Sequence, residues 1–259
     1  MKITKIIALL LALMVCLSLV SCKRREGEES RGLEMTLSEN GSYYTVTGIG
    51  KCKDYDILIP REYKGLPVMA IGERAFKGEN ITRITLTENV LYIADRAFEG
   101  CNSIVYNELE GLYYLGTEKN PAYALVCANE NSKGTFTIHK ETKILADSAL
   151  YDCDITSLSL PEGITHIGKA ALYSCDKLEN IALPETLRSI GDEAFGNCGA
   201  LATITLPQNL ALLGSDVFMY CSKLTKINFS GTSAAWEAIE KSPKWDRDME
   251  EYTLVFTEN

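Results

Sequence analysis

Cysteine and histidine are the residue types in this chain best suited to redox, nucleophilic or metal-binding chemistry. The 259-residue sequence has nine cysteines but only two histidines, His139 and His166. Neither histidine lies in a pattern that pairs a nucleophile with a base, and both are expected to be solvated. The cysteines form no C-x-x-C motif and have no histidine pair beside them, as a zinc site would require. The sequence therefore predicts no catalytic residue, no metal and no cofactor.

Two short motifs resemble catalytic loops but lack a required residue. Residues 163–169 have the spacing of a phosphate-binding loop, but the next residue is Ala170 instead of the serine or threonine that would hold magnesium. Residues 231–235 lack the last glycine of a nucleophile elbow. We therefore expect that the chain is not an enzyme, because an enzyme would need a clustered acid, base or metal site.

Most of the cysteines recur at one position of a repeated segment. Five of them occupy one slot of successive segments: Cys101, Cys153, Cys175, Cys198 and Cys221. Adjacent strands lie about 4.8 Å apart, so this slot forms a ladder of buried free thiols if the segments stack. Disulfides between neighbours are the alternative, because the Cα separation they need is about 4.4–6.8 Å. Cys52 and Cys127 lie outside the ladder, and their state is open.

The element that must position these cysteines is a repeat. Pro161, Pro184 and Pro207 are 23 residues apart, and so are the glycines and cysteines that follow them. A period of 20–50 residues indicates stacked units. Each unit alternates apolar and polar residues up to the proline, which predicts a short strand. An Ile-Gly pair then predicts a bend, where glycine would tolerate unusual backbone angles. One unit alone buries too little apolar surface to fold, so the units must stack.

The repeat resembles the BspA-type leucine-rich repeats of bacterial surface proteins. The motif is Leu-x-x-Ile-x-Leu-Pro-x-x-Leu-x-x-Ile-Gly-x-x-Ala-Phe-x-x-Cys, as in residues 178–198, and the resemblance covers residues 57–229. The departures are Leu150 and Leu172 for phenylalanine, Ala94 and Ala146 for glycine, and Glu79 near a cysteine position. The resemblance implies a right-handed leucine-rich-repeat solenoid, with one parallel β-strand per turn and an irregular or short helical convex side. It also implies binding or adhesion, not catalysis.

The N-terminus has the features of an export signal. A basic start is followed by an apolar run of about a dozen residues, shorter than the roughly 20 of a membrane-spanning helix. Residues 19–22 resemble the lipobox of bacterial lipoproteins, in which the cysteine, here Cys22, is lipidated. The alternative is an ordinary secretory signal. We expect a signal in residues 1–22, a flexible tether in 23–32, and a membrane-anchored lipoprotein at the bacterial cell surface or in the periplasm.

The flanks and the interruption of the repeat predict further elements. Asn40 and Gly41 lie between alternating stretches and predict a hairpin in residues 33–56, whose Met35, Leu37, Tyr44 and Val46 would close the stack. Residues 230–259 predict a C-terminal cap with a short helix and a strand. Residues 107–133 predict a hairpin that projects from the solenoid or lies along it. Its tyrosines could form a recognition element, but packing on the core is the favoured interpretation: Tyr113, Tyr114 and Tyr123.

The polar positions of the predicted strands form the candidate binding face. They are Arg83, Thr85, Ser157, Ser159, Asn180, Thr203, Thr205, Lys226 and Asn228. They are interpreted either as a plain polar ladder or as a shallow site for a protein or glycan partner. The net charge of −9 leaves no basic patch for nucleic acid. The sequence thus predicts a non-catalytic binding module with a lipid anchor, and the alternative is a structural or assembly scaffold of the cell envelope.

Overall fold

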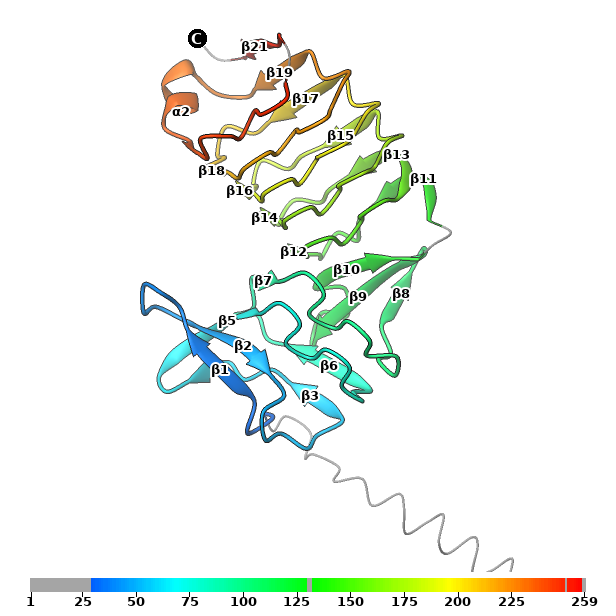
Figure 1. Ribbon diagram of the computed structural model, residues 1–259, viewed down its shortest axis with the longest axis vertical. Helices are drawn as coiled ribbons and strands as arrows, with labels where there is room; N and C mark the ends of the chain where they lie inside the picture. The colour runs from blue at the N-terminus through cyan, green and yellow to red at the C-terminus, as the bar shows by residue number, and fades with distance from the viewer. Residues whose placement is uncertain (1–28, 130–131, 250, 258–259) are drawn as a thin grey trace, which may run out of the picture.

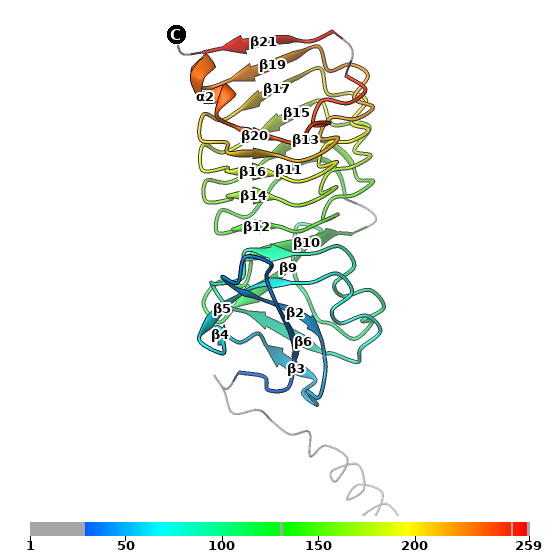
Figure 2. The same cartoon turned by 60° about the vertical axis from the view of Figure 1, so that its left-hand side comes forward.

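The computed structural model describes residues 29–129, 132–249 and 251–257. This part of the chain winds into a coil in which successive turns stack along one axis (Figure 1, Figure 2). Most turns contribute one strand to a row on one side of the coil and a second, shorter strand to another row. The parallel solenoid expected from the repeat is therefore confirmed. The leader and Cys22 lie outside the described residues.

The first row contains the longer strand of each unit, which is followed by a proline in four of the eight turns. They are β3 (Asp56–Leu58), β6 (Arg83–Leu86), β11 (Lys133–Thr137), β13 (Asp154–Ser159), β15 (Asn180–Ala182), β17 (Thr203–Leu206), β19 (Lys226–Phe229) and β21 (Thr253–Phe256). Ile204 of β17 lies opposite Ile227 of β19, and both are buried, whereas Thr203 and Lys226 on either side are exposed. The period of two thus places equivalent residues of successive turns on the same face.

The second row is formed mostly by two-residue strands at the bend. They are β5 (Leu66–Ile71), β7 (Tyr92–Ile93), β12 (Ile144–Leu145), β14 (His166–Ile167), β16 (Ser189–Ile190), β18 (Leu212–Leu213) and β20 (Glu240–Lys241). Neighbouring members pair in parallel, as in Ile167 with Ile190. β4 (Glu62–Tyr63) pairs antiparallel with β5. The sequence did not predict this row, because two residues are too few to show a strand period.

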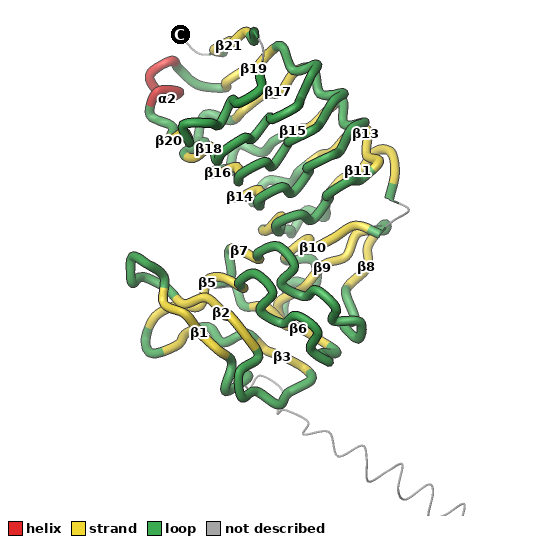
Figure 3. The backbone as a smooth tube through the Cα atoms, viewed as in Figure 1, coloured by secondary structure: helices red, strands yellow, loops and turns green. Residues whose placement is uncertain are grey.

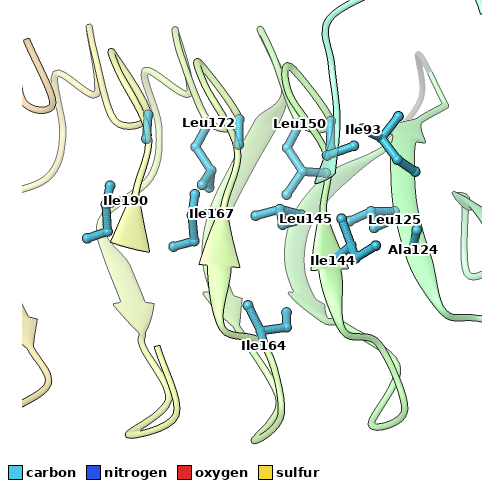
Figure 4. Packing of buried hydrophobic residues seen from close by; sticks show 14 of the residues in the cluster. Ile93, Ala124, Leu125, Ile144, Leu145, Leu150, Ile164, Ile167, Leu172 and Ile190 are labelled. Atoms are coloured by element: carbon cyan, nitrogen blue, oxygen red, sulfur yellow. The ribbon is translucent and has the colours of Figure 1, made fainter. Parts of the chain in front are cut away.

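Aligned apolar side chains fill the coil. Ile190, Ile167 and Leu145 occupy equivalent places in consecutive turns (Figure 4), and each is at most 1% exposed. In the phenylalanine slot, Phe195 stacks on Phe218 with ring centroids 5.7 Å apart and planes at 15°. Each turn therefore packs chiefly against its two neighbours, which makes the stability of the array depend on nearest-neighbour contacts.

The glycines of the Ile-Gly pair serve close packing instead of an unusual backbone angle. Gly168, Gly191 and Gly214 do not have positive φ, so the bend does not require their conformational freedom. A Cβ on Gly214 would lie 2.5 Å from the backbone nitrogen of Asp192 in the preceding turn, and one on Gly168 would lie 2.5 Å from that of Asp147. The sequence-based explanation of these glycines was wrong, and their lack of a side chain is what lets adjacent turns approach.

The interruption of the repeat is built into the stack. Its strands are β8 (Asn107–Leu109), β9 (Leu112–Thr117) and β10 (Ala124–Ala128), and each pairs antiparallel with the next. β9 also pairs in parallel with β6 of the first row, and β10 pairs in parallel with β12 of the second row. The insert thus joins the N-terminal turns (residues 57–106) to the C-terminal turns (residues 132–257), and it neither projects from the coil nor lies along it.

The two ends carry the expected hairpin and helix. β1 (Glu34–Leu37) and β2 (Tyr44–Gly48) pair antiparallel, and β2 pairs in parallel with β5. Val46 is buried, but Leu37 is 45% exposed, so the expectation that Leu37 closes the stack was wrong. α2 (Ser233–Glu237), drawn in red in Figure 3, begins after Thr232, whose hydroxyl accepts a bond from the backbone of Ala235. Among the described residues, no helix is long and apolar enough to span a bilayer.

Candidate functional site

The predicted binding face forms two polar rows on the C-terminal turns. In one polar row Ser157 pairs with Asn180, and Thr203 pairs with Lys226. In the other polar row Thr205 pairs with Asn228, whose amide donates to the threonine hydroxyl at 3.4 Å. Exposed threonines that the sequence prediction omitted extend both rows: Thr135 and Thr137 on β11, and Thr253 on β21. The face spans two neighbouring three-stranded sheets, β11–β13–β15 and β17–β19–β21, and its exposed strand positions are almost without aromatic side chains.

The predicted face does not reach the N-terminal turns. Ser159 belongs to the sheet of β11, β13 and β15, whereas Arg83 and Thr85 lie on β6. β6 pairs with β3 and with β9 of the insert, so the insert lies between these two residues and the rest. Arg83 also forms an ion pair with Asp56 at 3.6 Å. The structure therefore brings together seven of the nine predicted residues and leaves Arg83 and Thr85 apart.

The tyrosines of the insert differ in exposure. Tyr114 is 1% exposed, and Tyr123 is 6% exposed. The Tyr123 hydroxyl donates to the carbonyls of Glu88 and Val90 at 3.0 and 3.1 Å, and burial raises its pKa to about 12. Tyr113 is half-buried against Tyr106. Tyr114 and Tyr123 therefore hold the insert to the core, and neither presents a surface for recognition.

The five predicted cysteines are free thiols, and four of them, Cys153, Cys175, Cys198 and Cys221, follow one another in consecutive turns. Four of the five donate a hydrogen bond from Sγ to a carbonyl of the preceding turn; these bonds run from Cys101 to Phe76, Cys175 to Leu150, Cys198 to Leu172, and Cys221 to Phe195. Cys153 is the first of the ladder after the insert, and its thiol contacts the Tyr151 carbonyl of its own turn at 3.7 Å. Cys52 and Cys127 are also free and half-buried. The slot thus favours a small side chain that can donate one bond.

Buried thiols of this kind predict a loss of stability in alkaline solution. Burial raises the pKa of Cys175 from 9.0 to about 12. Between these values the unfolded chain loses the proton and the folded chain keeps it, so the free energy of unfolding falls as the pH rises above 9. From pH 8 to pH 10 this thiol is expected to cost about 1 kcal/mol. Urea denaturation at both pH values, in the presence of reductant, would show a smaller pH effect in Cys175→Ala than in the natural protein; equal effects would contradict the assignment.

A cleft of about 600 Å³ opens where the insert interrupts the stack. Tyr92, Asp95 and Arg96 line it from the N-terminal turns, and Asp147, Tyr151 and Glu193 line it from the C-terminal turns. We call it the seam cleft. Tyr92 belongs to β7, and Asp147 follows β12 along the chain. Figure 1 shows these two strands on either side of the place where the insert enters the stack.

The seam cleft exists because a backbone ladder is missing there. In the regular stack the backbone N–H of Leu150 donates to the Ala171 carbonyl, and that of Asp152 donates to the Tyr173 carbonyl. Phe76 and Ala97 are joined in the same way in the N-terminal turns. Residues 96–100 and 147–151, all within the described ranges, are not joined by any such bond. The two turns therefore separate on this side, and side chains fill the edges of the gap.

Asp147 joins the two sides at the base of the seam cleft. One carboxylate oxygen accepts from the backbone N–H of Lys169 at 2.7 Å, and the other accepts from the Tyr92 hydroxyl and from the backbone N–H of Asp95. Its own N–H donates to the Ile93 carbonyl at 3.1 Å. Burial raises the pKa of Asp147, and burial together with the bond to Asp147 raises the pKa of Tyr92. The base of the cleft is thus fixed by hydrogen bonds across the seam.

Among the described residues, no group of three or more histidine, cysteine or acidic side chains is arranged to hold a metal. His166 is half-buried, where we expected solvation, and this burial lowers its pKa. Its Nδ1 atom lies 2.6 Å from the hydroxyl oxygen of Thr165.

A family model described as the BspA type leucine rich repeat region matches six copies in residues 66–118 and 128–242, well over half of the chain. The chain belongs to the BspA-type leucine-rich repeat family. Its BspA-type repeats include β5 and extend to β20, and the match is interrupted within the insert. Membership is consistent with a binding or adhesion module and indicates no enzyme family. No curated protein matches the chain at a significant level.

Solved structures of bacterial proteins also match parts of this chain, with TM-scores below 0.5. One is a leucine-rich cell surface protein of Faecalibacterium prausnitzii, with 14% identity, a TM-score of 0.49, and a match that covers 85% of this chain and 98% of the other. The pneumococcal vaccine antigen PcpA has 20% identity and a TM-score of 0.47, with coverage of 68% and 51%. A leucine-rich repeat protein of T. pallidum has 21% identity and a TM-score of 0.31, with coverage of 78% and 71%.

Sequence reasoning missed the seam cleft in this BspA-type chain. Tyr151 and Tyr173 occupy one slot of neighbouring repeats, between the Ala-Leu pair and the cysteine, and this aromatic pair was a readable signal. The exposure of Tyr151 in a cleft depends on the missing ladder, which the repeat pattern does not reveal.

Proposed function

We propose that this chain is a surface-tethered, non-catalytic binding module that recognises a protein or glycan through its repeats. The observation that carries the proposal is the alignment of equivalent polar residues within two neighbouring three-stranded sheets, β11–β13–β15 and β17–β19–β21. A register of this kind offers a partner an extended set of hydroxyl, amide and amine groups on a rigid support. The lipid anchor at Cys22 is part of the same proposal and would hold the repeats at a membrane.

Binding is tested with the purified protein, immobilised and probed with panels of matrix proteins and glycans. If the polar rows bind the partner, Lys226→Glu is expected to weaken binding by about tenfold, because it reverses the charge of a residue that belongs to one of these rows. Lys223→Glu is the matched control, since Lys223 is exposed outside the strand and makes the same charge change. Absence of binding to both panels would contradict the proposal, and so would equal losses of affinity in the two variants.

Location is tested on intact cells. Protease added outside the cell is expected to remove the repeats, and replacement of Cys22 by serine is expected to abolish labelling by a fatty-acid probe and release the protein from the membrane. Cross-linking in the same cells separates the proposal from the alternative of an envelope scaffold. Foreign partners would support a binding module, whereas links only between copies of this chain would support the scaffold.

A further inference from the structure

We infer that the seam cleft is a binding site for a neutral glycan. The inference rests on the proposed function, because it assigns a ligand class to one part of the repeat surface. The seam cleft has a volume of about 600 Å³, which lies within the range of about 300–1,000 Å³ found for ligand sites.

The ring of Tyr151 forms one side of the cleft and is supported by the ring of Tyr173. Tyr151 is 51% exposed, and its ring stacks on that of Tyr173, with centroids 5.5 Å apart and planes at 7°. The Tyr173 ring in turn lies over Gly196, where a Cβ would come within 2.6 Å of it. Gly196, Tyr173 and Tyr151 thus form a column that ends at the cleft. A braced ring of this kind is held ready for a ligand and loses little freedom on binding.

The face of a tyrosine ring suits a sugar. Its π-system is electron-rich at the face, and the C–H groups on one side of a pyranose ring carry partial positive charge, so the two surfaces attract. Tyr92, on the opposite side of the cleft, is 42% exposed and has its hydroxyl fixed to Asp147. The cleft therefore presents aromatic surface from both sides of the seam.

Charged side chains that line the same cleft can form hydrogen bonds with the polar groups of a sugar. Asp95 and Glu193 can accept hydrogen bonds from sugar hydroxyls, and Arg96 and Lys169 can donate to sugar oxygens. Arg96 already lies 3.4 Å from the Asp95 carboxylate, which sets an acceptor beside a donor, as vicinal hydroxyls require. Such mixed donors and acceptors match a neutral polyol.

The balance of charge selects against anionic sugars. Carboxylates from Glu73, Asp95, Asp147 and Glu193 outnumber the two cations that line the cleft. A sialylated or sulfated glycan would meet net repulsion here. A neutral hexose or N-acetylhexosamine chain avoids this repulsion.

The test is titration of the purified protein with neutral oligosaccharides chosen from an array, with sialylated and sulfated counterparts beside them. We expect binding of neutral glycans and weaker binding of the anionic ones. Tyr151→Ala is expected to reduce affinity by at least about tenfold, as truncation of a central aromatic contact does. Tyr151→Phe, which keeps the ring, is expected to retain most of the affinity. Tyr220→Ala is the matched control, because Tyr220 is 57% exposed in another turn and does not line the cleft.

Each outcome separates this inference from the broader proposal. Glycan binding that Tyr151→Ala leaves unchanged, or that Tyr220→Ala reduces equally, would overturn the assignment to the cleft. Binding of a protein partner that Lys226→Glu weakens, with no glycan bound, would overturn the inference and leave the proposed function standing. Absence of any ligand would overturn both. Thermal unfolding of the variants shows whether a loss of affinity comes from the site, because truncation of the exposed Tyr151 is expected to leave the fold intact.

Discussion

Replacement of Phe195 by alanine is expected to lower the free energy of unfolding by about 3–5 kcal/mol. Phe195 is fully buried and stacks on Phe218, which in turn meets the edge of Trp245 in the last turn. Because each turn depends on its two neighbours, a cavity here weakens the contact that holds the C-terminal turns to the rest of the array. Urea denaturation followed by circular dichroism measures the change.

The control for Phe195→Ala is Leu212→Ala. Leu212 lies on β18 in the same region but is 39% exposed, so its truncation is expected to change stability by no more than about 0.5 kcal/mol. If the two variants lost similar amounts of stability, the phenylalanine position of the repeat would not be what stabilises the stack.

Replacement of Gly191 by alanine is expected to destabilise the protein by about 1–3 kcal/mol, because it adds a methyl group where none fits. The new Cβ would lie 2.7 Å from the backbone nitrogen of Lys169 and 2.9 Å from the carbonyl carbon of Gly168. Both atoms belong to the backbone of the preceding turn, which cannot move aside without disturbing the pairing of β14 with β16. The midpoint of thermal unfolding is the measurement.

Gly199→Ala makes the same chemical change in open space. A Cβ at Gly199 would meet no atom within 4 Å, and this glycine does not have positive φ. Alanine there is expected to leave stability unchanged or raise it by up to about 1 kcal/mol, since it restricts the unfolded chain. Destabilisation by Gly199→Ala to the extent seen for Gly191→Ala would rule out close approach of turns as the explanation.

The period of the sequence was enough to predict the first row of strands, the phenylalanine slot and the cysteine slot. In a stack, the neighbours of Cys198 are Cys175 and Cys221, so a repeat unit determines its own surroundings. The features that depend on more than one unit could not be predicted in this way. The two-residue strands show no period of their own, and the approach of backbones at Gly191 is a distance between turns. The separation of Arg83 from the other polar strand residues follows from the pairing of the insert with β6.

The candidate site was only partly predictable for the same reason. Ser157, Thr203 and Lys226 share a face because they share a repeat position, and the structure places them as expected. The seam cleft arises where the repeat fails, between turns that are not consecutive in sequence. Its residues come from five different turns, and nothing in the unit relates Tyr92 to Glu193.

The position of the insert also decides how such a chain can change in length. Between residues 161 and 229 one unit follows another with the same step and the same register, so the duplication or loss of a whole unit would present each remaining turn with an equivalent neighbour. Between β6 and β12 this freedom is absent, because β9 and β10 fit one particular neighbour on each side. Gene variants that lengthen or shorten the coil are therefore expected to do so beyond the insert, with the seam unaltered.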